Sequence, residues 1–455
     1  MEEATPGGTL PHVSTELPGP RSRDLARRLG RVESRNITRI DSEGPLFLAA
    51  ASGALIRDVD DNLFIDLTSG FGAAIAGHAN PRVTAAIAGQ AARLPHAMGD
   101  VHPAEAKTLL LERLAALAPG DLSISILGSA GAEAVEAALK TALLRTGRPG
   151  IVAFEGGYHG LTYGALAATG RAEFRSPFTA QLFAGVRFAP FPSDDDAEPD
   201  ASVDESIAAV AGHFADAEAG PCPIGVILVE PVQGRGGIIV PPAGFLARLR
   251  DMCDGRSTIL VFDEIYTGFG RTGEWFACQH SGVVPDIMTV GKALAGVLPI
   301  SAAIGTQDVM NAWPASTGEA IHTSTFLGNP IACAAAIAQL SEIEEHGLVR
   351  RAALLGSRIR TRLDPWPARY EIVRNVRGLG LLQGIVMRAR VGSAPAAIAA
   401  DVAHRALQSG VLALTEGSNG DVLAITPPAT ITEAQLDHAL DVVESAIAGA
   451  CQRVP

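Results

Sequence analysis

Short apolar runs bounded by turn residues recur along the chain and alternate with stretches of helical periodicity. The runs lie at residues 123–127, 151–154, 224–229, 259–262 and 287–290. Apolar runs of this length predict strands that are buried on both faces, as in a parallel sheet. Stretches at 103–117, 128–147, 245–253 and 326–345 predict helices between or after them.

The two ends of the chain carry other patterns. Residues 53–67 alternate around Asp60-Asp61-Asn62, which predicts a β-hairpin. Beyond residue 346 we expect a smaller α/β unit: a helix, one strand at 376–387, a helix at 396–409, a second strand and a final helix from about 432. The charged run at 193–205 predicts a solvated loop that leads into a helix.

Two ionisable residues stand where predicted strands end. Asp263 closes the run at 259–262, with Glu264 next to it, and Lys292 follows the run at 287–290. Ligands of open α/β sheets bind outside the carboxyl ends of the strands, so Asp263 and Lys292 are expected to face one crevice. A lysine amine condenses with an aldehyde cofactor, and a carboxylate keeps a pyridine nitrogen protonated. These are the groups that pyridoxal 5′-phosphate (PLP) requires from a protein.

The scarcity of lysine sharpens this hypothesis. The chain has three lysines, Lys107, Lys140 and Lys292, and the first two lie in predicted helices. A surface lysine at a strand end is the alternative interpretation of Lys292. The small neighbours Gly291 and Ala293 favour the cofactor lysine.

The segment 268–273, GFGRTG, matches the dinucleotide fingerprint G-x-G-x-x-G. That fingerprint must follow its strand directly and open a helix. Here DEIYT lies between the strand and the glycines, and EWFACQHSG makes a poor helix. We therefore reject a nicotinamide site.

DEIYTGFGRTG (263–273) followed by PDIMTVGKALAGVLP (285–299) resembles the signature of class III PLP-dependent aminotransferases. The resemblance extends from about residue 18 to 448. It implies fold type I: an α/β protein with a large PLP-binding domain, whose mostly parallel sheet is flanked by helices, and a smaller α/β domain. We expect an N-terminal segment at 1–75 that packs with the small domain, the large domain at 76–330 and the small domain at 331–455.

A phosphate site is predicted in GSAGAEAVEAALKTALLRTG (128–147), where small residues enter a helix. Free N–H groups and the helix dipole attract anions there, although a simple strand–helix turn fits equally well. The resemblance places the PLP phosphate at Gly131 and Ala132. Relatives usually carry a hydroxyl residue at one or both of the positions of Ala130 and Ala132.

The resemblance also implies roles for aromatic residues. Tyr158, in the glycine-rich loop EGGYHGLT (155–162), is expected to stack on the cofactor ring with His159 beside it, and Tyr266 to bind the cofactor. A packed loop is the alternative for the Tyr-His pair. Phe71 falls where relatives place an aromatic of the substrate pocket, although simple packing is equally plausible.

Two further motifs concern the substrate and the partner. Glu230, in EPVQG (230–234), is expected to face the active site and to arrange the substrate or a nearby arginine. Thr325, in HTSTFLGNP (322–330), corresponds to the residue that reaches the phosphate of the neighbouring subunit in relatives. The resemblance therefore implies a homodimer with shared active sites.

The residues that would bind a second carboxylate are missing. Relatives that use glutamate and 2-oxoglutarate carry two arginines, and the corresponding positions hold Leu161 and Ala424. We therefore expect an acceptor with one carboxylate or none, pyruvate-like or an aldehyde, and an apolar pocket. Arg171, Arg175 and Arg235 are possible replacements that the sequence does not place.

Composition limits the other classes of function. The net charge of −13 argues against nucleic acid as a partner. No apolar run approaches the length of a membrane span, and the first thirty residues lack the apolar core of a secretory signal. The five cysteines show neither metal-ligand spacing nor a disulfide framework, which fits the cytoplasm.

We therefore predict an aminotransferase that moves an amino group from an amine or amino acid to a keto acid or aldehyde by a ping-pong mechanism. Lys292 would carry the cofactor and act as general base, and Asp263 would keep the pyridine nitrogen protonated. A racemase, epimerase or decarboxylase would use the same two residues and stays an alternative. A non-catalytic PLP-binding protein is a weaker one.

Overall fold

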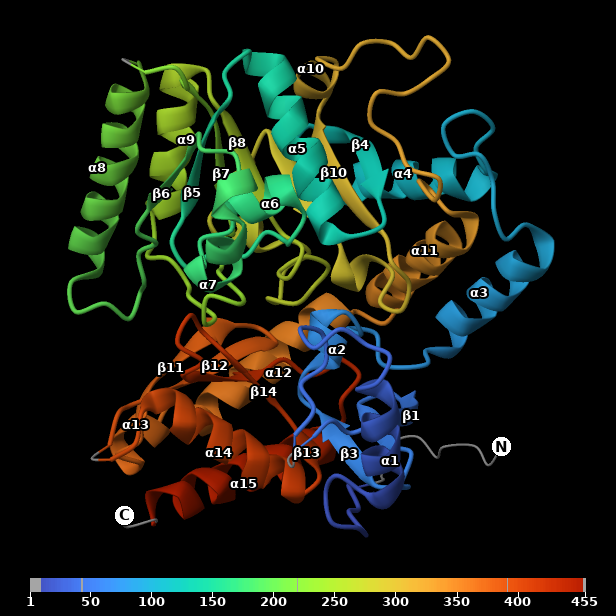
Figure 1. Ribbon diagram of the computed structural model, residues 1–455, viewed down its shortest axis with the longest axis vertical. Helices are drawn as coiled ribbons and strands as arrows, with labels where there is room; N and C mark the ends of the chain where they lie inside the picture. Colours follow the sequence, from blue (N-terminus) through green and yellow to red (C-terminus); the bar gives the residue numbers. More distant parts are fainter. Residues whose placement is uncertain (1–9, 42–43, 219, 391, 453–455) are drawn as a thin grey trace.

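The computed structural model describes residues 10–41, 44–218, 220–390 and 392–452. Figure 1 shows two parts, one built around the central segments of the chain and one that joins both ends of the chain. The N-terminal segment and the C-terminal third lie together below the central part in this view. The first nine residues of the N-terminal segment expected at 1–75 lie outside the described ranges.

The central part contains a seven-stranded sheet in the order β4-β10-β9-β8-β7-β5-β6. The strands from β9 to β6 run parallel, and β10 is antiparallel to both of its neighbours. The predicted apolar runs are thus adjacent strands of one mostly parallel sheet. Their bounds are β4 Leu122–Gly128, β5 Gly150–Phe154, β6 Val186–Ala189, β7 Ile224–Val229, β8 Ile259–Asp263, β9 Ile287–Val290 and β10 Ser301–Thr306.

Helices on both faces explain why these strands are apolar throughout. Side chains alternate across a strand, so Ile259 and Val261 of β8 pack in the same core as Val135 of α5. Leu260 and Phe262 pack in the other core, together with the residues of α8, α9 and α11. The helices of this part are α3 Pro81–Arg93, α4 Glu105–Leu117, α5 Gly131–Thr146, α6 Tyr163–Ala168, α7 Ala172–Arg175, α8 Pro199–Glu218, α9 Phe245–Arg256, α10 Gln307–Met310 and α11 Pro330–Glu345; the short helix α2 Ser69–Gly72 belongs to the N-terminal segment below it.

The second part has two four-stranded sheets. The antiparallel sheet β11-β12-β15-β14 is formed by the C-terminal segment alone. In the other sheet, β1-β2-β3-β13, the N-terminal strand β3 pairs in parallel with the C-terminal strand β13. The elements are α1 Pro20–Leu29, β1 Leu48–Ser52, β2 Leu55–Asp58, β3 Leu63–Asp66, α12 Leu348–Leu363, α13 Trp366–Arg369, β11 Val373–Leu379, β12 Leu382–Met387, α14 Pro395–Gln408, β13 Val411–Leu412, β14 Leu414–Glu416, β15 Val422–Ile425 and α15 Glu433–Cys451.

Two predicted elements need correction, and one is confirmed. Residues 376–387 are not one strand but parts of the hairpin β11–β12, which turns at Gly380 with φ of 51°. The helix expected from about residue 326 begins at Pro330, because the side chain of Asn329 accepts from the N–H groups of Ile331 and Ala332 and caps it there. The predicted hairpin at 53–67 is present as β2 and β3.

The charged run at 193–205 is also not simply solvated. Asp195 is 10% exposed and lies 3.0 Å from Nη1 of Arg377, which is itself 9% exposed. Asn375 donates to the same carboxylate. The carboxylate therefore joins the central part of the chain to β11, a contact that a local charge pattern does not reveal.

None of the helices in the described ranges combines the length and the apolar composition that a membrane span needs.

Candidate active site

Lys292 and Asp263 line one pocket at the carboxyl ends of β8 and β9. The pocket has a volume of about 530 Å³. It is lined by Ala130, Gly131, Ala132, Tyr158, His159, Gly160, Leu161, Thr162, Glu230, Arg235, Asp263, Ile265, Tyr266 and Lys292. The structure thus brings together nine predicted site residues from five separate segments. It also places Arg235, one of the three possible replacement arginines, in the pocket, and it adds Ile265.

Lys292 is held in an unusual backbone conformation directly after β9. Its φ is 40°, a region that residues other than glycine rarely adopt. Such strain persists only where the surroundings enforce it, and it is typical of functional sites. The Nζ atom lies 4.5 Å from the centre of the Tyr266 ring. Burial lowers the pKa of Lys292, while the charges of Asp263 and Glu230 oppose this effect. A lowered pKa favours the neutral, nucleophilic amine.

Asp263 is fixed through both carboxylate oxygens. Its Oδ2 lies 2.7 Å from Nδ1 of His159, and its Oδ1 accepts from the hydroxyl of Thr289 and the N–H of Ile265, both at 3.1 Å. The side chain is 3% exposed. The carboxylate therefore has one orientation relative to the pocket.

The adjacent acid, Glu264, serves the fold instead. Side chains alternate along a strand, so Glu264 points away from the pocket side of Asp263. Its carboxylate accepts from the N–H groups of Ala277 and Cys278, at 2.9 and 2.7 Å, and from the hydroxyl of Thr267. These bonds fix the loop that follows DEIYT.

The N-terminus of α5 forms one end of the pocket. Ala130, at its N-cap, offers no side-chain cap, so the first N–H groups of this 16-residue helix are free of a capping side chain. The helix dipole adds partial positive charge at the same place. A Cβ on Gly131 would lie 2.9 Å from Cδ1 of Ile265, so a larger residue would not fit between helix and loop.

Glu230 joins the loop of Tyr158 to the loop that follows β7. Its Oε1 accepts from the N–H of Tyr158 at 2.9 Å, and its Oε2 accepts from the N–H of Gly234 at 3.0 Å. Burial raises the pKa of Glu230 to about 7. The rings of Tyr158 and Phe174 form an edge-type contact with centroids 5.7 Å apart, and the guanidinium of Arg235 lies over the Tyr158 ring.

Phe71 and Thr325, the two remaining predicted residues, do not line this pocket. Phe71 is 67% exposed and has a φ of 61°. The residue that follows it, Gly72, lies close to the pocket residue Tyr266. A Cβ on Gly72 would lie 2.3 Å from the Tyr266 ring. Thr325 is exposed on the segment between α10 and α11.

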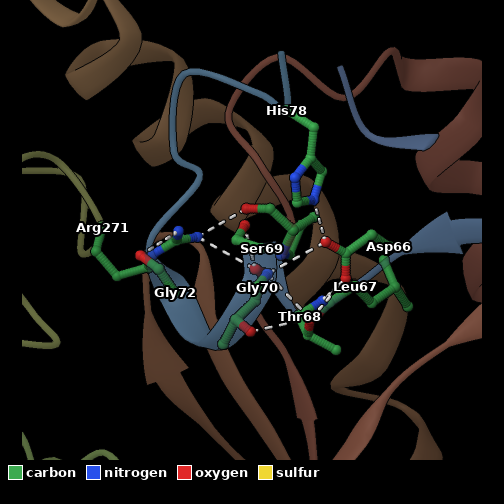
Figure 2. A network of polar contacts seen from close by, with 10 residues as sticks. Asp66, Leu67, Thr68, Ser69, Gly70, Gly72, His78 and Arg271 are labelled. Atoms are coloured by element: carbon green, nitrogen blue, oxygen red, sulfur yellow. Dashed lines mark hydrogen bonds and ion pairs between the residues drawn. The ribbon is translucent and has the colours of Figure 1, made fainter. Parts of the chain in front are cut away.

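The loop of Phe71 is held by the polar network of Figure 2. Asp66 accepts from Thr68 and Gly70 and lies 2.7 Å from Nε2 of His78. Arg271, from the GFGRTG segment, donates to the carbonyl of Gly72 at 3.2 Å. The arginine of the rejected nucleotide motif therefore holds the loop of Phe71, which lies against the pocket residue Tyr266 at Gly72.

Comparison with known proteins identifies the family. The model of the class III aminotransferases matches residues 38–447. A 4-aminobutyrate aminotransferase of Mycobacterium leprae is 35% identical over 436 residues, which cover 94% of this chain and 96% of the relative. An alanine/serine racemase of Pyrococcus horikoshii is 32% identical over 445 residues, which cover 96% of this chain and 92% of the relative.

The solved structures agree with this family. A PLP-bound amine transaminase from an uncultivated Pseudomonas species has a TM-score of 0.84 and 30% identity, covering 92% of this chain and 99% of that one. The predicted fold type I architecture and the predicted PLP-dependent aminotransferase are confirmed. The chain belongs to the class III aminotransferases, enzymes that depend on pyridoxal 5′-phosphate.

Proposed function

We propose that this aminotransferase passes an amino group from an amine or amino acid to an acceptor with one carboxylate or none. The observation that carries the proposal is the pocket itself, which combines the amine of Lys292, the fixed carboxylate of Asp263 and the N-terminus of α5 with an apolar wall. The amine matches the aldehyde of PLP, the carboxylate its pyridine nitrogen and the helix terminus its phosphate. The residues present therefore fit the cofactor.

The residue roles follow from this fit. PLP, when bound, supplies an electron sink for the carbanion formed at the substrate carbon. Lys292 would hold the cofactor through its amine and would be the base positioned to move the substrate proton. Asp263, oriented by His159, would keep the pyridine nitrogen protonated. Tyr158 would stack on the cofactor ring, Tyr266 would bind the cofactor, and Glu230 would arrange the loop beside the substrate.

The phosphate is bound by the N–H groups of Gly131 and Ala132 and by Thr325 of the partner subunit in a homodimer. In support, Thr325 is exposed beside the apolar side chains of Ile321 and Phe326, which are 70% and 60% exposed. Exposed apolar side chains close together favour contact with another protein surface. Phe71, exposed beside Gly72, which lies close to the pocket residue Tyr266, would complete the substrate site.

Acceptor choice rests on two positions. Leu161 lines the pocket, and Ala424, on β15, is buried in an apolar cluster with Val232, Tyr266 and Leu382. Neither side chain can bind a carboxylate. Losing one partner of a buried charged pair costs about 2–5 kcal/mol, so the second carboxylate of 2-oxoglutarate should be poorly accommodated.

The test is an amine-donor screen of the purified holoenzyme that follows the absorbance of bound cofactor, with kinetics for pyruvate and 2-oxoglutarate. We expect amine-dependent loss of that absorbance and a preference for pyruvate. A clear preference for 2-oxoglutarate would refute the acceptor proposal.

A racemase is the second candidate, because the alanine/serine racemase named above is 32% identical over nearly the whole chain. The two activities differ in stoichiometry. A transaminase consumes one keto acid or aldehyde for each amino group moved, whereas a racemase inverts its substrate without an acceptor.

Two broader proposals accompany this function. The division into an N-terminal segment (1–75), a large domain (76–330) and a small domain (331–455) is supported by the pairing of β3 with β13. A cytoplasmic location is supported by the five cysteines, all of them free thiols.

A further inference from the structure

Arg235 places a cation in the wall of the pocket. It immediately follows EPVQG, and its guanidinium lies 4.6 Å from the centre of the Tyr158 ring and 5.7 Å from that of Phe174. The side chain is 38% exposed, so part of the guanidinium faces the open pocket. Stacking on an aromatic ring fixes the plane of a guanidinium and leaves its edges available for hydrogen bonds.

The partner of Arg235 within the chain is held loosely. Oε2 of Glu416, at the end of β14, lies 3.6 Å from Nε of Arg235. This separation is longer than the 2.7–2.9 Å of a strong charged hydrogen bond. Glu416 is 8% exposed, and burial raises its pKa against the opposing charges of Arg235 and Arg171. A buried carboxylate with a distant cation is a weak competitor for that cation.

The other two candidate arginines are committed elsewhere. Arg171 pairs with Glu173 at 2.7 Å and donates to the carbonyl oxygens of Arg235 and Gly417. Arg175 lies over the ring of Phe188 at 4.1 Å and lines a different cavity. Among the three, Arg235 is the one that lines the pocket of Lys292.

We propose that Arg235 binds the carboxylate of the amino acid or keto acid substrate. In the absence of that substrate Glu416 is the counter-ion of Arg235, and the substrate carboxylate replaces it in this pairing. The assignment rests on the proposed aminotransferase function and names its substrate class: keto acids with a single carboxylate. When the substrate is an amine or aldehyde without a carboxylate, Glu416 remains the partner of Arg235. The guanidinium therefore has an anionic partner with either kind of substrate.

The test compares two acceptors that differ only in the carboxylate, pyruvate and acetaldehyde. We expect Arg235→Gln to lower kcat/KM for pyruvate on the order of 100-fold. The decrease in kcat/KM for acetaldehyde should be at least tenfold smaller. Arg235→Lys should recover part of the pyruvate activity, because it restores the charge without the planar fork. The matched control is Arg145→Gln, at the C-terminal end of α5. Arg145 is 44% exposed and pairs with Asp308 on the surface.

Binding of propionate, a carboxylate that cannot react, gives a readout independent of turnover. By calorimetry on the holoenzyme, Arg235→Gln should weaken propionate binding, and Glu416→Gln should strengthen it by removing the competitor. An unchanged pyruvate-to-acetaldehyde ratio together with unchanged propionate affinity in Arg235→Gln would overturn the assignment. Absence of amino transfer from any donor in the wild type would instead overturn the proposed function, and the propionate measurement would still decide the role of Arg235.

Discussion

Arg271 should be a main structural link between the loop of Phe71 and the C-terminal segment of the chain. Its side chain is fully buried, and its guanidinium donates to the carbonyl oxygens of Leu381, Thr426, Pro427 and Gly72 at distances from 2.7 to 3.3 Å. No carboxylate in the described ranges lies within ion-pair distance of it. Replacement by methionine keeps an unbranched side chain and removes every donor.

The expected cost follows from two opposing effects. The carbonyls of Gly72, Leu381 and Pro427 lose this donor, whereas that of Thr426 keeps the hydroxyl of Ser69. Each buried acceptor left unsatisfied costs about 1–3 kcal/mol. Burial lowers the pKa of Arg271 from 12.5 to about 10, so removal of the charge recovers about 3 kcal/mol. The net destabilisation should therefore be about 3 kcal/mol.

Native-state hydrogen exchange measures this effect where it occurs. In Arg271→Met, amides at 67–72 and 424–426 should exchange roughly 100-fold faster, because a local opening becomes about 3 kcal/mol easier. Arg271→Lys should be at least as destabilised, since it keeps a buried cation but cannot reach carbonyls on three segments.

Arg351→Met is the matched control. Arg351 also donates to backbone carbonyls of the C-terminal segment, those of Ala429 and Ile431, but it is only partly buried, so water can replace it. We expect a cost of about 1 kcal/mol or less there. The reasoning is refuted if exchange in Arg271→Met equals that of the wild type, or if the lysine variant is more stable than the methionine variant.

Three further predictions concern the site. Borohydride reduction of the holoenzyme followed by peptide mapping should place the phosphopyridoxyl group on Lys292, and label on Lys107 or Lys140 would exclude this role. A bulky residue at Thr325 should weaken PLP binding, and mixed dimers with a Lys292 variant should regain one good site; no recovery despite subunit exchange would argue against shared sites. Glu230 has a pKa raised from 4.5 to about 7 by burial, so its folded form binds a proton more tightly than its unfolded form. The stability of the cofactor-free protein relative to Glu230→Gln should therefore fall as pH rises from about 4.5 through 7. Melting curves of both proteins across this pH range measure the difference, and a difference in Tm that grows in favour of the wild type would contradict the prediction.

Local patterns were sufficient to predict the large sheet and the strand-end residues. A run such as 259–262 is apolar because helices cover both faces of β8, so the buried strand shows in the sequence without knowledge of its neighbours. The positions of Asp263 and Lys292 then follow from the rule that ligands bind beyond the carboxyl ends of parallel strands. The small-residue entry to α5 is a local signal of the same kind.

Contacts between distant segments could not be predicted in this way. Asp195 lies in a charged run typical of a solvated loop, but Arg377, 182 residues later, makes it a buried ion pair. Arg235 belongs to a loop, and only the folded chain shows that it stacks on Tyr158 and faces Glu416. Charge and spacing along the sequence do not determine such pairings, because they depend on how the two parts of the molecule meet.

The charges around Lys292 limit the substrates that the pocket can take. Glu230, Asp263 and Glu416 all raise the pKa of the amine, and Arg235 lowers it, so three acids and one cation act on the same nitrogen. A substrate carboxylate at Arg235 would pair with that cation in place of Glu416. A second carboxylate would meet no further cation of this group and would face acids or apolar side chains. The electrostatics of the pocket therefore favour a monocarboxylate with an apolar remainder over a dicarboxylate, independently of the residues at 161 and 424.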